Sequence, residues 1–150
     1  MEWEIYDLDK NEDGFTYEFY SEGPKGRIRK IIQFQHLNDF GKNVFNLAFG
    51  DFDEVINRIN DRVVSNNGDQ LKILHTIAET VIDFFRLYPE AIILMEGSSS
   101  SRTRLYQMKI AAFWSVITRQ FEIWGELGDE WLSFQKGVNY KRLLIYKKIK

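Results

Sequence analysis

The sequence contains no cysteine, which excludes a disulfide scaffold, a cysteine-ligated zinc or iron–sulfur centre and a cysteine nucleophile. It has only two prolines and no internal repeat, and its 150 residues are 44% hydrophobic, which fits a single globular domain over residues 1–150. No segment approaches the roughly 20 apolar residues that a membrane-spanning helix requires. The acidic start is unlike a signal or transit peptide, so we expect a cytoplasmic protein without membrane contact.

A surplus of either charge is also absent, because 20 basic and 22 acidic residues leave a net charge of −2. A protein that wraps duplex DNA usually carries a large basic surplus, which this chain lacks. The distribution is nevertheless uneven, since the first residues are mainly acidic and the last ones are basic without any acid. The basic end either protects an edge strand and aids solubility, or forms a local anion-binding stripe.

Alternation of apolar and polar residues predicts four successive strands at the start of the chain, at 15–20, 27–35, 44–52 and 58–65. Apolar residues then recur at spacings of three and four from Leu71 to Phe85, which predicts an amphipathic helix that ends at Tyr88 and Pro89. We expect the remaining elements to be a buried strand at 91–96, a second helix from about Ser101, and strands at 121–127 and 140–148, with a further short strand possible at 131–134.

These elements predict an α+β fold with a single mixed, mainly antiparallel sheet and two main helices, in the order β-β-β-β-α-β-α-β-β. The segments 58–65 and 91–96, joined by the first helix, are expected to form a right-handed β-α-β crossover.

Two loops that lead from a strand into a helix are candidate anion sites, because the free N–H groups and the dipole of a helix start attract negative charge. The first loop consists of Asn66, Asn67, Gly68, Asp69 and Gln70. Asp69 also suits an N-cap, so the alternative is a structural cap without a ligand.

The second loop runs from Gly97 into the next helix and offers hydroxyl groups and guanidiniums from Ser99, Ser100, Ser101, Arg102 and Arg104. Ligands in open sheets favour the carboxyl ends of strands, and the expected crossover would bring both loops to that end. The alternative is a flexible serine loop whose arginines pair with surface acids.

The predicted hairpin around residues 23–30 is a third candidate, because basic residues beside aromatic rings on a sheet can hold single-stranded nucleic acid. Its candidate residues are Lys25, Arg27, Arg29, Tyr17 and Tyr20. The alternative is an ordinary twisted hairpin with an aromatic core face and a solvated basic face.

Catalytic and metal-binding patterns are scarce. The two histidines, His36 and His75, lie far apart in the sequence, and no HExxH, GxSxG, P-loop or EF-hand pattern occurs. One acidic turn, at 50–54, offers weak support for a metal, so we expect no metal site.

The segments FYSEGPKGRI, FNLAFGD, NNGD, SRTRLY and NYKRLLIY resemble a family of small uncharacterised bacterial proteins, a domain of unknown function. The order of elements from residue 44 onward also resembles the core of the GCN5-related N-acetyltransferases. VVSNNGDQLKIL then takes the place of that family's pyrophosphate-binding loop and helix, and EAIILMEGSSSSRTRLY takes the place of the next strand and helix. The hairpin is similar to the lysine/arginine–glycine–arginine hairpins of PUR-type nucleic-acid-binding domains.

The acetyltransferase resemblance implies an acyltransferase-like domain, active or catalytically degenerate, that binds an anionic small molecule such as acyl-CoA. Residues 66–70 would then hold phosphate, Arg102 and Arg104 would supply charge, and Tyr106 would protonate the leaving thiolate. The alternative is a non-enzymatic binding module for single-stranded nucleic acid or for a partner protein, including a second copy of the chain.

Overall fold

The computed structural model describes residues 4–60, 67–96 and 119–148, together with residues 100, 103, 104, 107, 108 and 111. This part of the chain contains nine bounded strands and one bounded helix, α1 (Gln70–Leu87). The strands are β1 (Asp9–Lys10), β2 (Thr16–Gly23), β3 (Gly26–His36), β4 (Val44–Asp53), β5 (Arg58–Asn60), β6 (Ile92–Met95), β7 (Phe121–Leu127), β8 (Glu130–Ser133) and β9 (Leu143–Lys147).

The strands form one mixed sheet in the order β1-β2-β3-β4-β6-β9-β7-β8, with β5 paired to β4. The pair β4 and β6 is parallel, whereas β2 with β3 and β7 with β9 are antiparallel. The chain divides into two compact units: a first unit, Met1–Gln35 with Ala48–Tyr88, and a second unit, His36–Leu47 with Pro89–Lys150. The expected α+β class with a mixed sheet is therefore confirmed.

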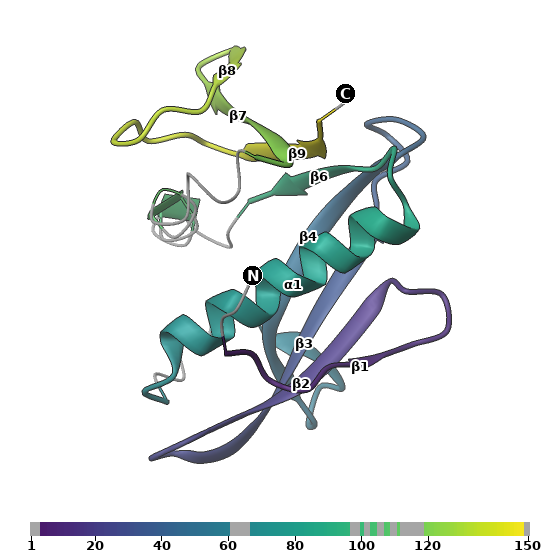
Figure 1. Cartoon of the computed structure of the whole chain (residues 1–150), viewed down its shortest axis with the longest axis vertical. Helices are drawn as coiled ribbons and strands as arrows, with labels where there is room; N and C mark the ends of the chain where they lie inside the picture. The colour runs from purple at the N-terminus through teal and green to yellow at the C-terminus, as the bar shows by residue number, and fades with distance from the viewer. Residues whose placement is uncertain are drawn as a thin grey trace. The chain divides into compact units, whose positions relative to one another are not determined.

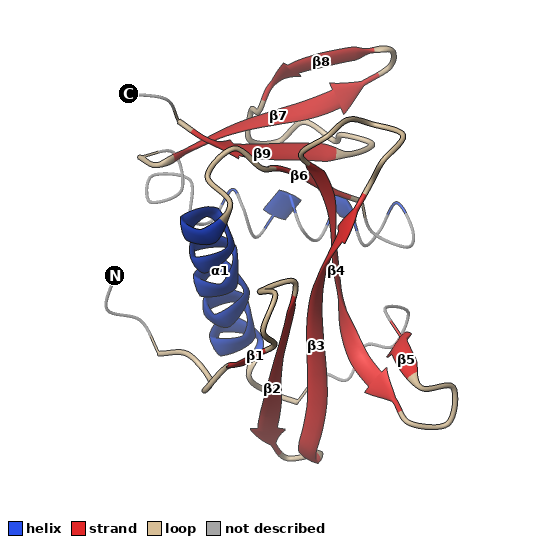
Figure 2. Ribbon diagram, turned by 90° about the vertical axis from the view of Figure 1, so that its right-hand side faces the viewer, coloured by secondary structure: helices blue, strands red, loops and turns tan. Residues whose placement is uncertain are grey.

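In the first unit, the β2–β3 hairpin packs one of its faces against α1 (Figures 1 and 2). Side chains alternate between the two faces of a strand, and Tyr17, Phe19, Ile32 and Phe34 share the face toward the helix, each at most 3% exposed. The ring of Phe34 stacks on that of Phe84 in α1, with centroids 3.9 Å apart. Burial of side chains of this size stabilises a fold by about 1.5–3 kcal/mol each, so this layer holds the helix on the hairpin.

The helix α1 ends where the sequence predicts. Its C-cap residue, Tyr88, donates its backbone N–H to the Phe84 carbonyl at 2.8 Å, and Pro89 follows. Two buried threonines of α1 donate their hydroxyls to helix carbonyls four residues earlier, Thr76 to Lys72 and Thr80 to Thr76. Among the described residues, no helix combines the length and hydropathy of a membrane span.

The second unit contains the small sheet of β6, β9, β7 and β8 and the start of β4. One face of this sheet is apolar and buried, with Ile93, Ile123, Leu143 and Ile145 at most 6% exposed. A Cβ atom on Gly125 would overlap the ring of Tyr140, so the glycine in β7 allows that ring to pack directly on the strand.

The expected crossover is wrong in its strand pairing. β5, which precedes α1, is antiparallel to β4, whereas β6, which follows α1, is parallel to β4. β5 and β6 are therefore not the two parallel strands that a β-α-β crossover requires. The chain forms a β4–β5 hairpin before the helix because Asp53 folds the turn: its side chain accepts the N–H groups of Val55 and Ile56 at 2.9 and 3.3 Å.

Other boundaries also differ from expectation. The predicted strand at 58–65 begins at Arg58, but its last residues, 61–65, lie outside the described residues. The described part of the chain has one bounded helix where two were expected, and the predicted second helix falls mostly on residues that are not described. The last strand begins at Leu143 and not at residue 140, because the side chain of Tyr140 packs on β7.

Candidate functional site

The loop before α1 is held against the end of the β2–β3 hairpin by a polar cluster around Asp69. One carboxylate oxygen of Asp69, Oδ2, accepts hydrogen bonds from the Tyr6 hydroxyl at 2.5 Å and from the Ser21 hydroxyl. The Tyr6 oxygen in turn accepts the backbone N–H of Glu22 at 3.0 Å. Burial, followed by the hydrogen bond to Asp69, raises the pKa of Tyr6 above its ordinary value, so this hydroxyl remains a donor at neutral pH.

Asn67 fastens the same loop to the hairpin turn. Its side chain, 2% exposed, donates to the Ser21 hydroxyl at 3.1 Å and to the Gly26 carbonyl at 2.9 Å. Its side-chain oxygen accepts the backbone N–H of Lys25 at 2.7 Å. A Cβ atom on Gly23 would overlap the Asn67 carbonyl, and Gly68 has a φ of +74°, so the two glycines permit the close approach.

The expectation that the Asp69 side chain caps the start of α1 is wrong. Asp69 occupies the N-cap position, but its side chain makes no capping hydrogen bond, because it turns away to Tyr6 and Ser21. Its second oxygen, Oδ1, is buried and has no hydrogen-bond partner among the described residues. A carboxylate at the start of α1 already places negative charge where a phosphate would bind. Gln70, the first helical residue, is exposed, and Asn66 lies outside the described residues.

The serine loop is described at Ser100 and Arg104, both exposed, whereas Ser99, Ser101, Arg102 and Tyr106 lie outside the described residues. Ser100 and Arg104 belong to the second unit and residues 67–70 to the first. That the two loops form one anion site therefore stays a prediction.

The outer face of the hairpin, opposite α1, carries two arginines stacked on aromatic rings. The guanidinium of Arg27 lies 4.0 Å from the centre of the Tyr20 ring, and that of Arg29 lies 4.1 Å from the centre of the Phe52 ring. Arg29 also binds Glu18 with both donor groups, at 2.8 and 3.0 Å. This pairing, opposed by burial, holds the pKa of the Glu18 carboxyl below its ordinary range.

The other residues of the predicted hairpin site do not all lie on the outer face of the hairpin. Arg27 is mostly exposed and lies 3.9 Å from Glu22, and Lys25 is exposed in the turn. Tyr17 is not available to a ligand on the outer face, because it points toward α1 and is 2% exposed. The prediction that Tyr17 belongs with Tyr20 in one binding surface is therefore wrong.

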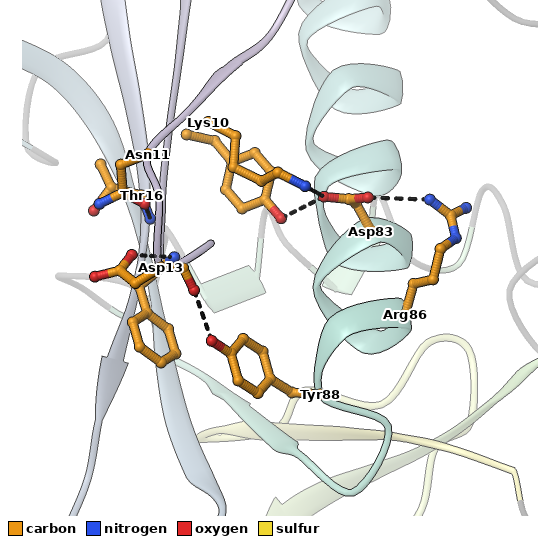
Figure 3. Close-up of polar contacts among 9 residues, drawn as sticks. Lys10, Asn11, Asp13, Thr16, Asp83, Arg86 and Tyr88 are labelled. Carbon is orange, nitrogen blue, oxygen red and sulfur yellow. Dashed lines mark hydrogen bonds and ion pairs between the residues drawn. The ribbon is translucent and has the colours of Figure 1, made fainter.

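Tyr17 instead belongs to an ionic cluster that sequence reasoning missed, in which Asp83 also binds Lys10 and Arg86 (Figure 3). Its hydroxyl donates to Asp83 of α1 at 2.7 Å, and the same carboxylate binds Lys10 of β1 at 2.9 Å and Arg86 at 3.0 Å. Burial and the contact with Asp83 raise the pKa of Tyr17 well above its ordinary value. Burial alone would raise the pKa of Asp83, but the bonds from Tyr17 and Lys10 lower it.

The same region fixes the turn between β1 and β2 (Figure 3). The side chains of Asn11 and Asp13 accept the backbone N–H groups of Thr16 and Phe15 at 3.1 and 2.8 Å. Tyr88, at the end of α1, donates its hydroxyl to the Asp13 carbonyl at 2.6 Å. The cluster thus connects both ends of this turn to the helix and has the character of a structural clamp.

A buried ion pair engages one carboxylate of the acidic stretch at 50–54. Asp51 of β4 pairs with Lys30 of β3, whose side chain is 5% exposed. Asp51 is therefore engaged by a cation rather than open to a substrate. Within the part of the chain that the structure describes, no group of three histidine or acidic side chains could hold a metal ion.

The comparisons with known proteins agree with the first resemblance and give no activity. No curated protein and no solved structure is significantly similar to the chain. A family model described as a family of unknown function, DUF6934, matches residues 2–148. Because this match covers almost the whole chain, the protein belongs to the DUF6934 family.

Proposed function

We propose that this chain is a non-enzymatic binding module, and that the outer face of its β2–β3 hairpin binds single-stranded nucleic acid. The observation that supports this most directly is the pair of guanidiniums stacked on Tyr20 and Phe52, on the sheet face that α1 does not cover. Flat cationic and aromatic groups on a sheet stack with bases of any sequence, while arginine also reaches phosphate oxygens.

The acyltransferase hypothesis has less support from the described residues. The side chains of Asn67 and Asp69 hold the hairpin, and Asp69 places a carboxylate where the phosphates of acyl-CoA would bind. The two strands that flank α1 also do not form the expected parallel crossover, since β5 is antiparallel to β4 and β6 is parallel to it.

The hairpin geometry also predicts how tightly the ligand binds. Phosphates must compete with Glu18 for Arg29 and with Glu22 for Arg27, so we expect modest affinity that increases when either carboxylate is removed. Glu18→Gln and Glu22→Gln should each strengthen binding, which is the opposite of what these changes would do at an enzyme site that uses the carboxylates.

The test is fluorescence anisotropy of a labelled twelve-nucleotide thymidine strand at several salt concentrations. The double variant Arg27→Ala/Arg29→Ala should weaken binding at least tenfold. The plot of log affinity against log salt should also become less steep by about 1.4, because each lost phosphate contact removes about 0.7 from the steepness for a single strand. Arg86→Ala, on α1, is the matched control and should bind as the native chain does. Equal binding by the double variant, or saturable thermal stabilisation of the native chain by acetyl-CoA, would refute the proposal.

A further inference from the structure

The strand β8 forms an open edge of the sheet in the second unit. Among the described strands it pairs with β7 alone, and it lies outermost in the small sheet (Figure 2). Native proteins often protect such an edge with lysine, proline or a bulge. Residues 129–134 contain neither lysine nor proline, and the pairing with β7 is continuous from Glu130 to Ser133. The edge is therefore available to another strand.

The backbone groups of Trp131 and Ser133 point outward along this edge. Opposed residues of antiparallel strands alternate between pairs that exchange hydrogen bonds and pairs that do not. Trp131 lies opposite Glu126, whose N–H bonds to the Arg142 carbonyl and whose carbonyl accepts the Lys141 N–H, both at 2.9 Å. The Glu126–Trp131 pair therefore exchanges no hydrogen bonds. By the same alternation, the N–H and carbonyl groups of Trp131 and Ser133 point away from β7, where a further strand would bond to all four.

The charges of the edge are complementary to those of a second copy in antiparallel orientation. The exposed acids Asp129 and Glu130 precede its apolar centre, and the exposed Lys136 follows it. Two antiparallel copies related by a two-fold axis at Leu132 place Glu130 of each opposite Phe134 of the other, two residues from Lys136. A parallel arrangement would place acids beside acids, which is destabilising.

The register centred on Leu132 also suits the backbone and the apolar surface. It pairs Trp131 of each copy with Ser133 of the other, which gives four hydrogen bonds between outward N–H and carbonyl groups. Leu132 is 40% exposed, and in this register it lies across the axis from Leu132 of the second copy. That pair exchanges no hydrogen bonds, so its side chains approach closely and cover each other.

We infer that β8 pairs with β8 of a second copy, so that the chain forms a symmetric dimer through an antiparallel pair of edge strands. The same patch meets itself across the axis, as a two-fold interface requires. The dimer is weak and depends on concentration, because contact along one short strand lies at the small end of specific interfaces. The inference does not rest on the proposed function, whose residues lie in the first unit.

Sedimentation velocity of the full chain over a dilution series measures this association, and hydrogen exchange of backbone amides locates it. The sedimentation coefficient should rise from that of a monomer to that of a dimer as concentration increases. The amides of Trp131 and Ser133 should exchange at least tenfold more slowly in the concentrated sample, whereas the Leu132 amide, already bonded to β7, should not change. A monomer at every concentration would overturn the inference and leave the edge to a strand of another protein.

Two variants act on the centre of the edge. Leu132→Lys places like charges across the axis and should weaken association at least tenfold. The matched control is Leu71→Lys, at a leucine of α1 that is 60% exposed, and it should associate as the native chain does. Ser133→Pro removes an outward N–H but no bond to β7, and it should weaken association at least fivefold. Native association by both Leu132→Lys and Ser133→Pro would overturn the inference.

A charge exchange tests the antiparallel orientation. Glu130→Lys and Lys136→Glu should each weaken association at least threefold, because each brings like charges together in the dimer. The double variant Glu130→Lys/Lys136→Glu should restore association, since it exchanges the two ends of the edge and keeps them complementary. A double variant that associates no better than the single ones would overturn this pairing. Arg27→Ala/Arg29→Ala should dimerise as the native chain does, so failure of the hairpin proposal and failure of this inference are separate results.

Discussion

Removal of the Asp83 carboxylate should destabilise the fold through Tyr17 far more than through the two exposed cations. Tyr17 is 2% exposed, and its hydroxyl has Asp83 as its hydrogen-bond acceptor. In Asp83→Ala a buried phenol loses that partner, which costs about 1–3 kcal/mol. Lys10 and Arg86 have side chains 38% and 69% exposed, and ion pairs at such positions contribute only about 0–1 kcal/mol. We therefore expect a loss of about 2 kcal/mol in the free energy of unfolding.

Urea denaturation followed by tryptophan fluorescence measures this loss, and a double-mutant cycle assigns it. Tyr17→Phe should itself destabilise the protein, and Asp83→Ala should cost much less in that background, with a coupling of about 1 kcal/mol. Arg86→Ala should change the unfolding free energy by less than about 0.5 kcal/mol. A cycle without coupling, or a larger effect from Arg86→Ala than from Asp83→Ala, would refute the assignment of the stabilisation to the buried phenol.

Three further perturbations test the same structure. Gly125→Ala should lower the midpoint of thermal unfolding by several degrees, because the new methyl group overlaps the Tyr140 ring. Gly128→Ala should lower that midpoint less, because the space around Gly128 is open and only its φ of +63° disfavours alanine. Asn67→Leu should destabilise the protein by about 2 kcal/mol in urea, since it removes three hydrogen bonds at a buried position, and an effect below 0.5 kcal/mol would contradict that role. The native pKa values of Asp83, Glu18 and Glu126 are lowered, so their stabilising contribution should be complete above the unfolded carboxyl pKa near 4 and should disappear as pH falls through the native values. Urea midpoints measured between pH 2 and 7 should decline only at the acidic end, and the decline should be smaller in Glu126→Gln.

Local sequence signals predicted the elements whose boundaries depend on neighbouring residues. Alternation and the Gly23–Gly26 turn located the β2–β3 hairpin, and the three–four spacing with Pro89 located α1. The strand β7 was predicted with its observed ends. β1 was missed because it contains only Asp9 and Lys10, which have no apolar alternation to reveal a strand.

Pairings between distant parts of the chain were not predictable in the same way. The cluster of Tyr6, Ser21 and Asp69 joins residues 48 to 63 positions apart, and the Tyr17–Asp83 bond joins residues 66 apart. A polar residue near a helix start has a familiar local role as a cap, so sequence reasoning assigned that role to Asp69. The structure uses its carboxylate in a long-range contact instead, and periodicity carries no information about such a partner.

The fastening of the α1 start to the hairpin also has an evolutionary consequence. Tyr6, Ser21, Asn67 and Asp69 satisfy one another across three separate stretches of the chain. A change at one of these positions leaves a polar side chain without its hydrogen-bond partner unless a second change compensates. Across the DUF6934 family, positions 6, 21, 67 and 69 should therefore covary, even in members whose surfaces have diverged.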